Sequence, residues 1–108
     1  MYSKGYKCIG VVMNKEDIKL AINNSDLYSK SEKLILTELV NVSVELISVI
    51  SAKSLKEKTG LSTTTTYTAL NSLKKRGVVV PNIHEPNSYN INKSDIIRLI
   101  EIYKNQQN

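Results

Sequence analysis

Apolar residues recur along this chain at spacings that predict short helices separated by brief strands. The segment YKCIGVVM (residues 6–13) is rich in apolar and β-branched residues and predicts a short strand. Asn14 is expected to cap the helix that follows. Two acidic residues then lie in the first turn, where their negative charge interacts favourably with the helix dipole. The apolar stripe of that helix is formed by Ile18, Ala21 and Ile22.

A second helix is expected after a polar connector. Ser29 or Ser31 can cap it, and the pattern predicts that it ends near Glu45. The segment LISVIS (residues 46–51) is too short and too β-branched for a helix, so it predicts a brief strand. The three-four spacing of the second helix is carried by Leu36, Leu39, Val40 and Ser43.

Two helices in close succession come next. Ser51 is expected to cap the first, and Gly60 is expected to close it in a left-handed conformation, with Leu55 facing inward. Ser62 begins the second, whose sequence contains five threonines although threonine is a mediocre helix former. Its buried face is predicted by an i, i+3, i+4, i+7 spacing of Thr66, Ala69, Leu70 and Leu73.

The last third of the chain predicts a hairpin and a final helix. The segment VVVPN (residues 78–82) favours a strand, HEPNS a turn, and YNIN (residues 89–92) an antiparallel return strand. Asn92 or Ser94 can cap the final helix, in which six of the eight positions from 96 to 103 are apolar. This stripe is wider than one helix face needs for a small core.

Positive charge is concentrated in one part of the sequence. The whole chain carries a net charge of +5, from 15 Lys and Arg against 10 Asp and Glu. Residues 51–82 hold six basic residues and one acidic residue, and the remainder carries nine of each sign. Because the excess surrounds the threonine-rich helix, a polyanionic partner is expected to bind there.

The sequence contains no recognisable catalytic or metal-binding constellation. Cys8 is the single cysteine, so it cannot form an intramolecular disulfide, and no spacing of His, Cys and carboxylates suits a metal. The apolar run CIGVVM (residues 8–13) is too short for a signal sequence, and no stretch is long enough to span a membrane. The expectation is a cytoplasmic protein that is not an enzyme and binds no cofactor.

The segment ISAKSLKEKTGLS (residues 50–62), followed by Thr65 and by the pair Leu70 and Leu73, resembles the helix-turn-helix of winged-helix DNA-binding proteins. In that family, a leucine of the second helix packs inward and a Gly-Leu-Ser turn follows. Two leucines then anchor the recognition helix, and a glycine and a β-branched strand lead into the wing. The resemblance covers residues 31–92.

The resemblance implies a mainly α fold with a small β-hairpin (α+β), namely a winged helix-turn-helix with an N-terminal strand-helix extension and a C-terminal helix. The extension and linker would occupy residues 1–28, the winged helix-turn-helix residues 29–92, and the C-terminal helix residues 93–108. Lys56 stands where the family usually has alanine, and Thr66 where it usually has valine. Lys56 can hold its ammonium in solvent over its aliphatic stem, and Thr66 can bond back to the carbonyl four residues earlier.

The resemblance further implies sequence-specific binding of double-stranded DNA, most simply by a transcriptional regulator. The recognition helix, residues 62–76, would enter the major groove, where threonine hydroxyls meet phosphates and base edges and methyl groups meet thymine. Basic side chains around it would neutralise phosphates. The expected DNA contacts are Ser62, Thr63, Thr64, Tyr67, Thr68, Asn71, Lys53, Lys74, Lys75, Arg76 and His84.

Several of these residues have an alternative role. Tyr67 is alternatively expected to pack on the wing. Lys74, Lys75 and Arg76 suit an ordinary solvated helix end equally well, because cations favour the C-terminal end of a helix dipole. His84 lies in the expected wing turn and is expected to be exposed to solvent, with contact to phosphate or the minor groove as a minority alternative.

The wide apolar stripe of the final helix predicts a homodimer, which would match a palindromic DNA site. The alternative is that the stripe packs on the helix that begins near Ser31 and completes the core. The pattern indicates no particular small-molecule effector. The predicted dimer contacts are Ile96, Leu99, Ile100 and Tyr103.

Two other functions fit the same residues. The order of a strand, a helix, a linker and a winged helix is also similar to the DNA-binding modules of plasmid or phage replication initiators and partition proteins. A winged-helix protein-interaction module is a further alternative. It is disfavoured because such domains often carry acids on the recognition helix, whereas residues 62–76 contain none.

Overall fold

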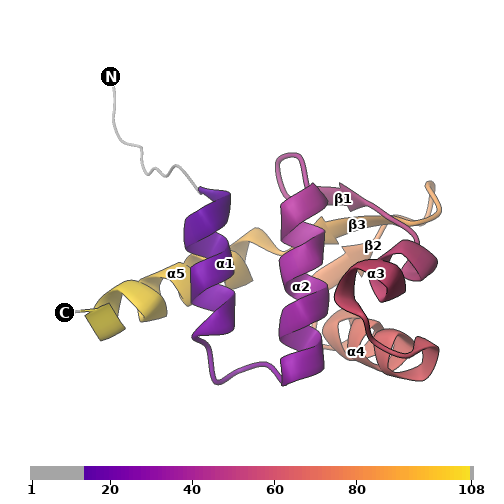
Figure 1. Ribbon diagram of the computed structural model, residues 1–108. Helices are drawn as coiled ribbons and strands as arrows, with labels where there is room; N and C mark the ends of the chain where they lie inside the picture. The colour runs from indigo at the N-terminus through magenta and orange to yellow at the C-terminus, as the bar shows by residue number, and fades with distance from the viewer. Residues whose placement is uncertain (1–13, 108) are drawn as a thin grey trace.

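A computed structural model of the chain describes residues 14–107, which fold into five helices and a three-stranded antiparallel sheet (Figure 1). This confirms the predicted α+β class, mainly helical with a small sheet. The strand expected within residues 6–13 lies outside the described residues. The elements are α1 (Lys15–Asn23), α2 (Lys30–Val42), β1 (Ile47–Val49), α3 (Ala52–Thr59), α4 (Thr63–Lys75), β2 (Val79–Pro81), β3 (Ser88–Ile91) and α5 (Lys93–Gln107).

Side-chain caps determine where the helices begin. At α2 the cap is reciprocal: Ser29 Oγ accepts from the Glu32 N–H at 3.2 Å, and Glu32 Oε1 accepts from the Ser29 N–H at 2.8 Å. For α2 and α5 the sequence left two candidate caps each. The observed caps are Ser29 for α2 and Asn92 for α5, and the Oδ1 of Asn92 accepts from the backbone N–H of Ser94 at 3.0 Å. The remaining caps were predicted correctly and are Asn14, Ser51 and Ser62.

The end of α2 differs from the prediction. The helix stops before Glu45 because Ser43 adopts extended backbone. Val44 and Ile47 then pair across a two-residue turn, in which Glu45 and Leu46 have φ values of 52° and 64°. Positive φ at both central positions is the pattern of a type I′ hairpin turn, which normally uses Asn or Gly there. The turn therefore holds two non-glycine residues in a left-handed conformation that L-residues disfavour.

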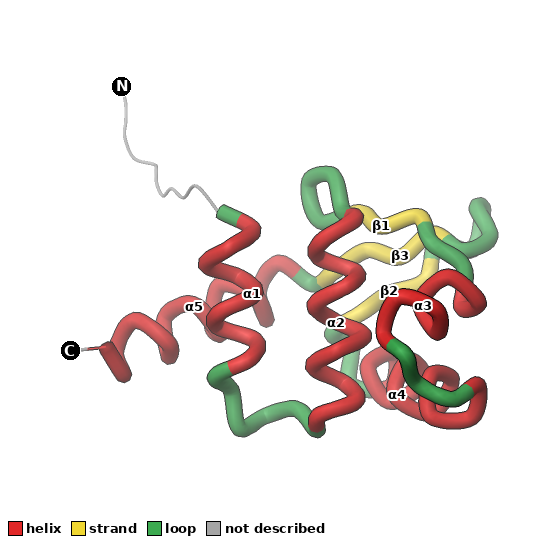
Figure 2. The backbone as a smooth tube through the Cα atoms, in the orientation of Figure 1, coloured by secondary structure: helices red, strands yellow, loops and turns green. Residues whose placement is uncertain are grey.

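The sheet has the strand order β1-β3-β2 (Figure 2). The hairpin of β2 and β3 was predicted, but the expected two-stranded ribbon is extended by β1, which pairs with the other side of β3. Ile47 and Val80 both lie opposite Asn90 in the ladders. The Ser48 hydroxyl donates to the Leu39 carbonyl at 2.6 Å, which joins β1 to α2 inside the core. A pairing between segments this far apart leaves no local sequence signal.

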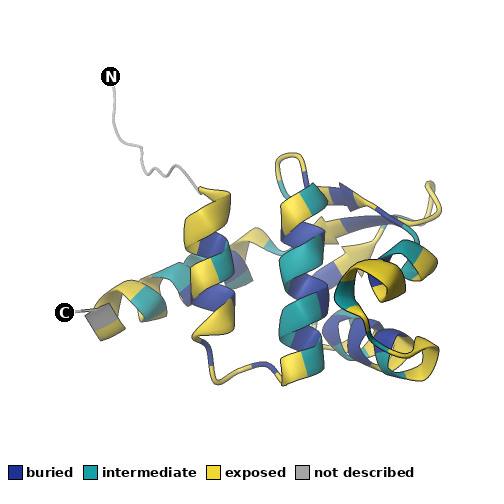
Figure 3. Cartoon of the chain, viewed as in Figure 1, coloured by how far each residue is buried: buried dark blue, intermediate teal, exposed yellow. Residues whose placement is uncertain are grey.

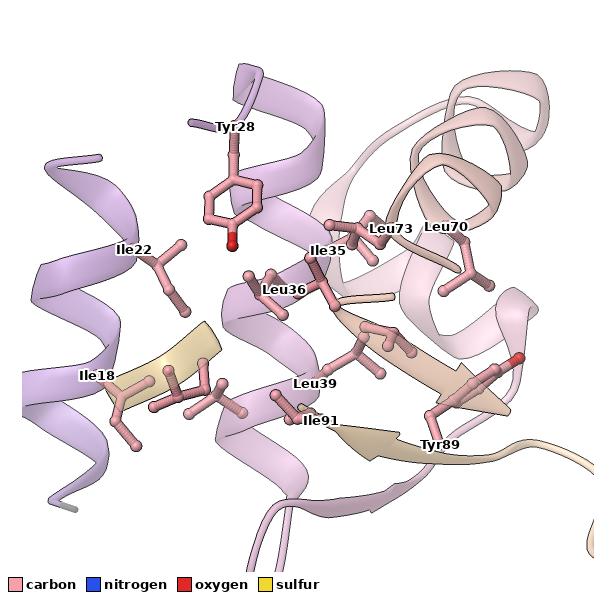
Figure 4. Packing of buried hydrophobic residues seen from close by; sticks show 14 of the residues in the cluster. Ile18, Ile22, Tyr28, Ile35, Leu36, Leu39, Leu70, Leu73, Tyr89 and Ile91 are labelled. Atoms are coloured by element: carbon pink, nitrogen blue, oxygen red, sulfur yellow. The ribbon is translucent and has the colours of Figure 1, made fainter. Parts of the chain in front are cut away.

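The hydrophobic core surrounds α2, which contacts α1 on one side and α3, α4 and β1 on the other (Figure 4). Buried side chains from the helices and from the inner face of the sheet point toward one another, while outward faces remain exposed (Figure 3). The largest fully buried side chains are Ile18, Ile22, Ile35, Leu36, Leu39, Val40, Leu55, Thr66, Leu70, Leu73, Val79 and Ile96.

The final helix, α5, packs against α1. Ile96 is 0% exposed and Leu99 is 2% exposed, so both belong to the core of the single chain and present no surface to a second copy. The prediction that these two residues form a dimer interface is therefore wrong. Ile100 and Tyr103 are half-buried against the same core. The alternative of intrachain packing is correct, although the main partner is α1 and not the helix that begins near Ser31.

The left-handed turn after α2 generates a stability prediction. Glu45→Asn is expected to raise the free energy of unfolding by roughly 0.5–1 kcal/mol, because asparagine tolerates positive φ better than glutamate. The matched control is Glu57→Asn in α3, which should lower that free energy slightly because asparagine is the poorer helix former. Urea denaturation measures the free energy of unfolding of both variants and of the parent chain. A Glu45→Asn chain less stable than the parent would contradict the inferred backbone strain at position 45.

Candidate nucleic-acid interface

The helices α3 and α4 are joined by a tight turn. Gly60 closes α3 with φ of 74°, and its N–H donates to the Lys56 carbonyl at 2.9 Å. Leu61 packs against the core, and Ser62 then caps α4 by accepting from the Thr65 N–H at 3.1 Å. Glycine suits the first of these positions because it adopts left-handed backbone without a steric penalty. The turn thus orients α4 relative to α3 with few residues.

The inner face of α4 is apolar apart from one threonine. Thr66 is 1% exposed, and its hydroxyl donates to the Ser62 carbonyl at 2.8 Å, so the buried polar group is satisfied within the helix. Its neighbours on this face, Ala69, Leu70 and Leu73, are also buried. Both the predicted inner face and the predicted hydrogen bond of Thr66 are confirmed.

The opposite side of α4 is exposed and polar. We call it the α4 outer face; Tyr67 there is 50% exposed, and no acidic residue occurs on the helix. At 100° per residue, its members fall on one side of the helix, away from the buried residues. Most of the predicted DNA contacts are thereby brought together. The α4 outer face consists of Thr63, Thr64, Tyr67, Thr68, Asn71 and Lys75.

Of the depressions that border the α4 outer face, two are each lined by a pair of lysines, and a third, between α2 and α4, has no lysine and includes Glu32. One of the lysine-lined depressions, of about 250 Å³, lies between α3 and α4 and includes Lys53 and Lys56. The other lies between α4 and β2 and includes Lys74 and Lys75. Cations therefore border the hydroxyl-rich surface on both sides, as a groove-binding helix between two phosphate strands requires.

Lys74 is held against the sheet. Its ammonium lies 5.5 Å from the centroid of the Tyr89 ring, a cation–π distance. Tyr89 is 7% exposed, and this burial raises the pKa of its phenol, with a smaller contribution from Tyr67. The phenol is therefore neutral at physiological pH. The Tyr89 ring holds the Lys74 ammonium in place without supplying a negative charge to pair with it.

Arg76, another predicted DNA contact, is held by intramolecular contacts although its side chain is 39% exposed. Its Nη1 lies 3.3 Å from both carboxylate oxygens of Glu32, and its Nη2 donates to the Leu27 carbonyl at 2.7 Å. The guanidinium also lies over the Tyr28 ring, 4.8 Å from the centroid. These contacts occupy the guanidinium, so the structure favours a role for Arg76 in attaching the end of α4 to α2.

Glu32 completes this attachment. Its Oε2 accepts from the Ser72 hydroxyl at 2.6 Å, so one carboxylate binds Ser72, Arg76 and its own helix cap, Ser29. We call these residues, with Tyr28, the Glu32 cluster. Burial alone would raise the Glu32 pKa, but the hydrogen bonds from Ser72 and Ser29 and the Arg76 charge outweigh it and lower the pKa. The sequence signalled only the cap, because Glu32 and Arg76 are 44 residues apart.

The remaining predicted contact, His84, lies on a different element. It is exposed in the loop between β2 and β3, where its N–H donates to Asn82 Oδ1 at 3.0 Å. Figure 2 shows this loop at the end of the molecule away from α1, the end where α3 and α4 also lie. Its neighbour Ile83 is 89% exposed. The loop is therefore exposed at the same end of the molecule as α3 and α4.

Residues 14–107 offer no group of three or more His, Cys, Asp and Glu side chains that could hold a metal ion. Within the same part of the chain, no helix combines the length and the apolar character needed to cross a bilayer. The α4 outer face itself offers hydroxyls, an amide and an ammonium group.

Comparison of the chain with protein-family models, with curated proteins and with solved structures gives no match. Any functional assignment therefore depends on the geometry and chemistry of its own residues.

The Glu32 cluster generates a prediction about acid stability. A carboxyl whose folded pKa is lowered stabilises the fold above its usual value of 4.5, and this contribution is lost as pH falls through the folded value. Glu32→Gln should therefore lower the free energy of unfolding at pH 7 by roughly 1–2 kcal/mol. At pH 3 the two chains should differ much less.

Chemical denaturation across this pH range measures the difference between the two chains. Glu101→Gln, the same change at an exposed position of α5, is the control and should have little effect at either pH. A loss of stability in Glu32→Gln that is equal at both pH values would contradict the predicted linkage.

Proposed function

We propose that this chain is a sequence-specific, double-stranded DNA-binding protein of the winged-helix type that acts as a transcriptional regulator. The observation that carries the proposal is the α4 outer face. It combines three threonines, a tyrosine, an asparagine and Lys75 without an acidic residue. It is bordered by Lys53 and Lys56 on one side and by Lys74 on the other. This composition suits a surface that meets base edges and phosphates together.

The order of the elements supports the winged-helix assignment. In that architecture, α3 and α4 form the helix-turn-helix, α4 is the recognition helix, and the loop between β2 and β3 is the wing. The third strand, β1, lies beside β3 and connects α2 to the helix-turn-helix. An α-helix fits the major groove of B-form DNA, and the N-terminal residues of a recognition helix contact the bases.

The individual side chains suggest how a sequence would be recognised. Thr64 and Thr68 each offer a hydroxyl to a phosphate or base edge and a methyl group to the thymine C5-methyl. Asn71 can pair with the N6 and N7 atoms of adenine through both halves of its amide. The wing, which includes His84, would contact the backbone or the minor groove.

Arg76 has a different role in this proposal. Its guanidinium already binds Glu32 and the Leu27 carbonyl, so it positions the end of α4 and does not contact phosphate. The phosphate contacts are assigned to Lys53, Lys56, Lys74 and Lys75, which border the two lysine-lined depressions beside α4. A homodimer is retained as part of the proposal, carried by the half-buried Ile100 and Tyr103 and the 40% exposed Ile102.

Selection of binding sites from random duplexes tests the proposal. It is expected to yield a preferred sequence, and two copies related by a two-fold axis should give inverted half-sites. Binding to the selected duplex should weaken as salt concentration rises. An absence of salt-dependent binding to both mixed and selected duplexes would rule the proposal out.

Base recognition can be separated from the rest of the interface with Thr64→Ala and Tyr67→Ala. Each should reduce the ratio of affinities for the selected and a scrambled duplex, by a factor that corresponds to roughly 1–3 kcal/mol. Thr65→Ala is the control, because Thr65 is half-buried and its Oγ1 accepts from the Ser62 hydroxyl at 2.9 Å. Fluorescence anisotropy measures these ratios. Discrimination that survives both outer-face substitutions would contradict the assigned contacts.

Phosphate contact has a distinct signature. Lys75→Ala should weaken binding to every duplex alike and reduce the slope of log affinity against log salt concentration by about one. Lys104→Ala removes the same charge from an exposed position on α5, and its slope should match that of the parent chain. An unchanged slope for Lys75→Ala would show that this lysine makes no phosphate contact.

A further inference from the structure

The face of the sheet that points away from the helices carries exposed aliphatic side chains on its two edge strands, on either side of the polar Asn90 of β3. Side chains alternate along β1, so Ser48 is buried while Ile47 and Val49 are 48% and 64% exposed. Val80 of β2 is 48% exposed and, like Ile47, lies opposite Asn90 of β3. Val44, which pairs with Ile47 before β1, is 75% exposed. We call these four residues the outer sheet face.

The outer sheet face is separate from the α4 outer face and takes no part in the proposed recognition of DNA. Single exposed aliphatic residues are normal on a protein surface, but neighbouring ones on a single face mark a contact surface. All four residues are β-branched and uncharged, so a complementary partner must be apolar as well. An extended segment with apolar side chains satisfies this requirement.

The chain itself supplies such a segment next to this face. Residue 14 begins the described part, and the adjacent Lys15 donates from Nζ to the carbonyl of Asn41 at 3.1 Å, near the end of α2. From there the backbone passes through Ser43 to Val44, the first residue of the outer sheet face. Figure 1 shows the start of α1 and the turn between α2 and β1 at the same end of the molecule.

The composition of residues 1–13 matches the outer sheet face. Residues 6–13 read YKCIGVVM, and residues 1–13 contain two lysines and no acidic residue. The turns that border the sheet carry the opposite charge, with Glu45 in one and Glu85 in the other. At about 3.3 Å for each extended residue, this length of chain reaches roughly 40 Å, which is ample to cross a small sheet.

We propose that residues 6–13 dock on the outer sheet face and cover Val44, Ile47, Val49 and Val80. The segment joins the described residues at Asn14, beside the end of α2, so its effective concentration at this face is in the millimolar range expected for a short tether. That advantage favours the same chain over a second copy in dilute solution. The contact is independent of DNA binding.

The single cysteine of the chain makes the proposal testable. Cys8 lies within the docking segment, and Val49→Cys places a second thiol on the outer sheet face of the full-length protein. Under a mild oxidant at low protein concentration, an intramolecular disulfide between the two positions should form. Peptide mass mapping of the monomer measures its rate, and Val80→Cys provides a second position on the same face.

Asn41→Cys is the matched control. Asn41 is exposed and lies beside the start of α1, so an undocked segment would reach a thiol there at least as fast as one at position 49. Docking should make the reaction at position 49 roughly tenfold faster than at position 41. Adding Ile9→Asp and Val11→Asp to the Val49→Cys chain should remove this difference.

Two results would overturn the proposal. Equal or faster reaction at position 41 would show that the segment has no preference for the outer sheet face. Disulfides that join two chains, at a rate that rises with protein concentration, would assign the face to a second copy. Circular dichroism of each variant confirms that the fold is retained before the rates are compared.

Discussion

The carboxylate of Glu32 joins the start of α2 to the end of α4. It completes the cap of α2 through Ser29, accepts from the Ser72 hydroxyl, and pairs with Arg76. Arg76 in turn reaches the Leu27 carbonyl and covers the Tyr28 ring, so the connector before α2 belongs to the same cluster. A nearly buried carboxylate is tolerated there because all of these contacts are satisfied together. The orientation of α4 on α2 is set by this cluster together with the apolar packing of buried side chains such as Leu36 and Leu73.

With its C-terminal end held by the Glu32 cluster and its N-terminal end by the turn at Gly60, α4 has one face left for a partner. The threonines of this helix divide accordingly. Thr66 is buried with its hydroxyl bonded to the helix backbone, while Thr63, Thr64 and Thr68 remain exposed. The hydroxyl of a threonine can therefore serve the core or the surface, depending on its angle around the helix. Although threonine is a modest helix former, it therefore has a use both on the buried face and on the exposed face of α4.

The chain also displays two surfaces of different chemistry. The α4 outer face is polar and bordered by lysines, whereas the outer sheet face is aliphatic and bordered by glutamates. A polyanion is attracted to the first, and it gains nothing from the second. Because they lie on separate elements, one surface can be occupied without changing the other. The proposed DNA contact and the proposed docking of the terminal segment would therefore use different surfaces of one small domain.

Local interactions explain how much of this could be predicted from the sequence. The N-caps of α1, α3 and α4, the left-handed Gly60 and the inner face of α4 each depend on residues within about two helical turns, so the sequence by itself determined them. Three features depend on distant residues, and only the tertiary structure decided them. These are the pairing of β1 with β3, the burial of Ile96 and Leu99 against α1, and the capture of Arg76 by Glu32. A local pattern shows which side chains are apolar or charged, but their partners are decided by how the elements pack.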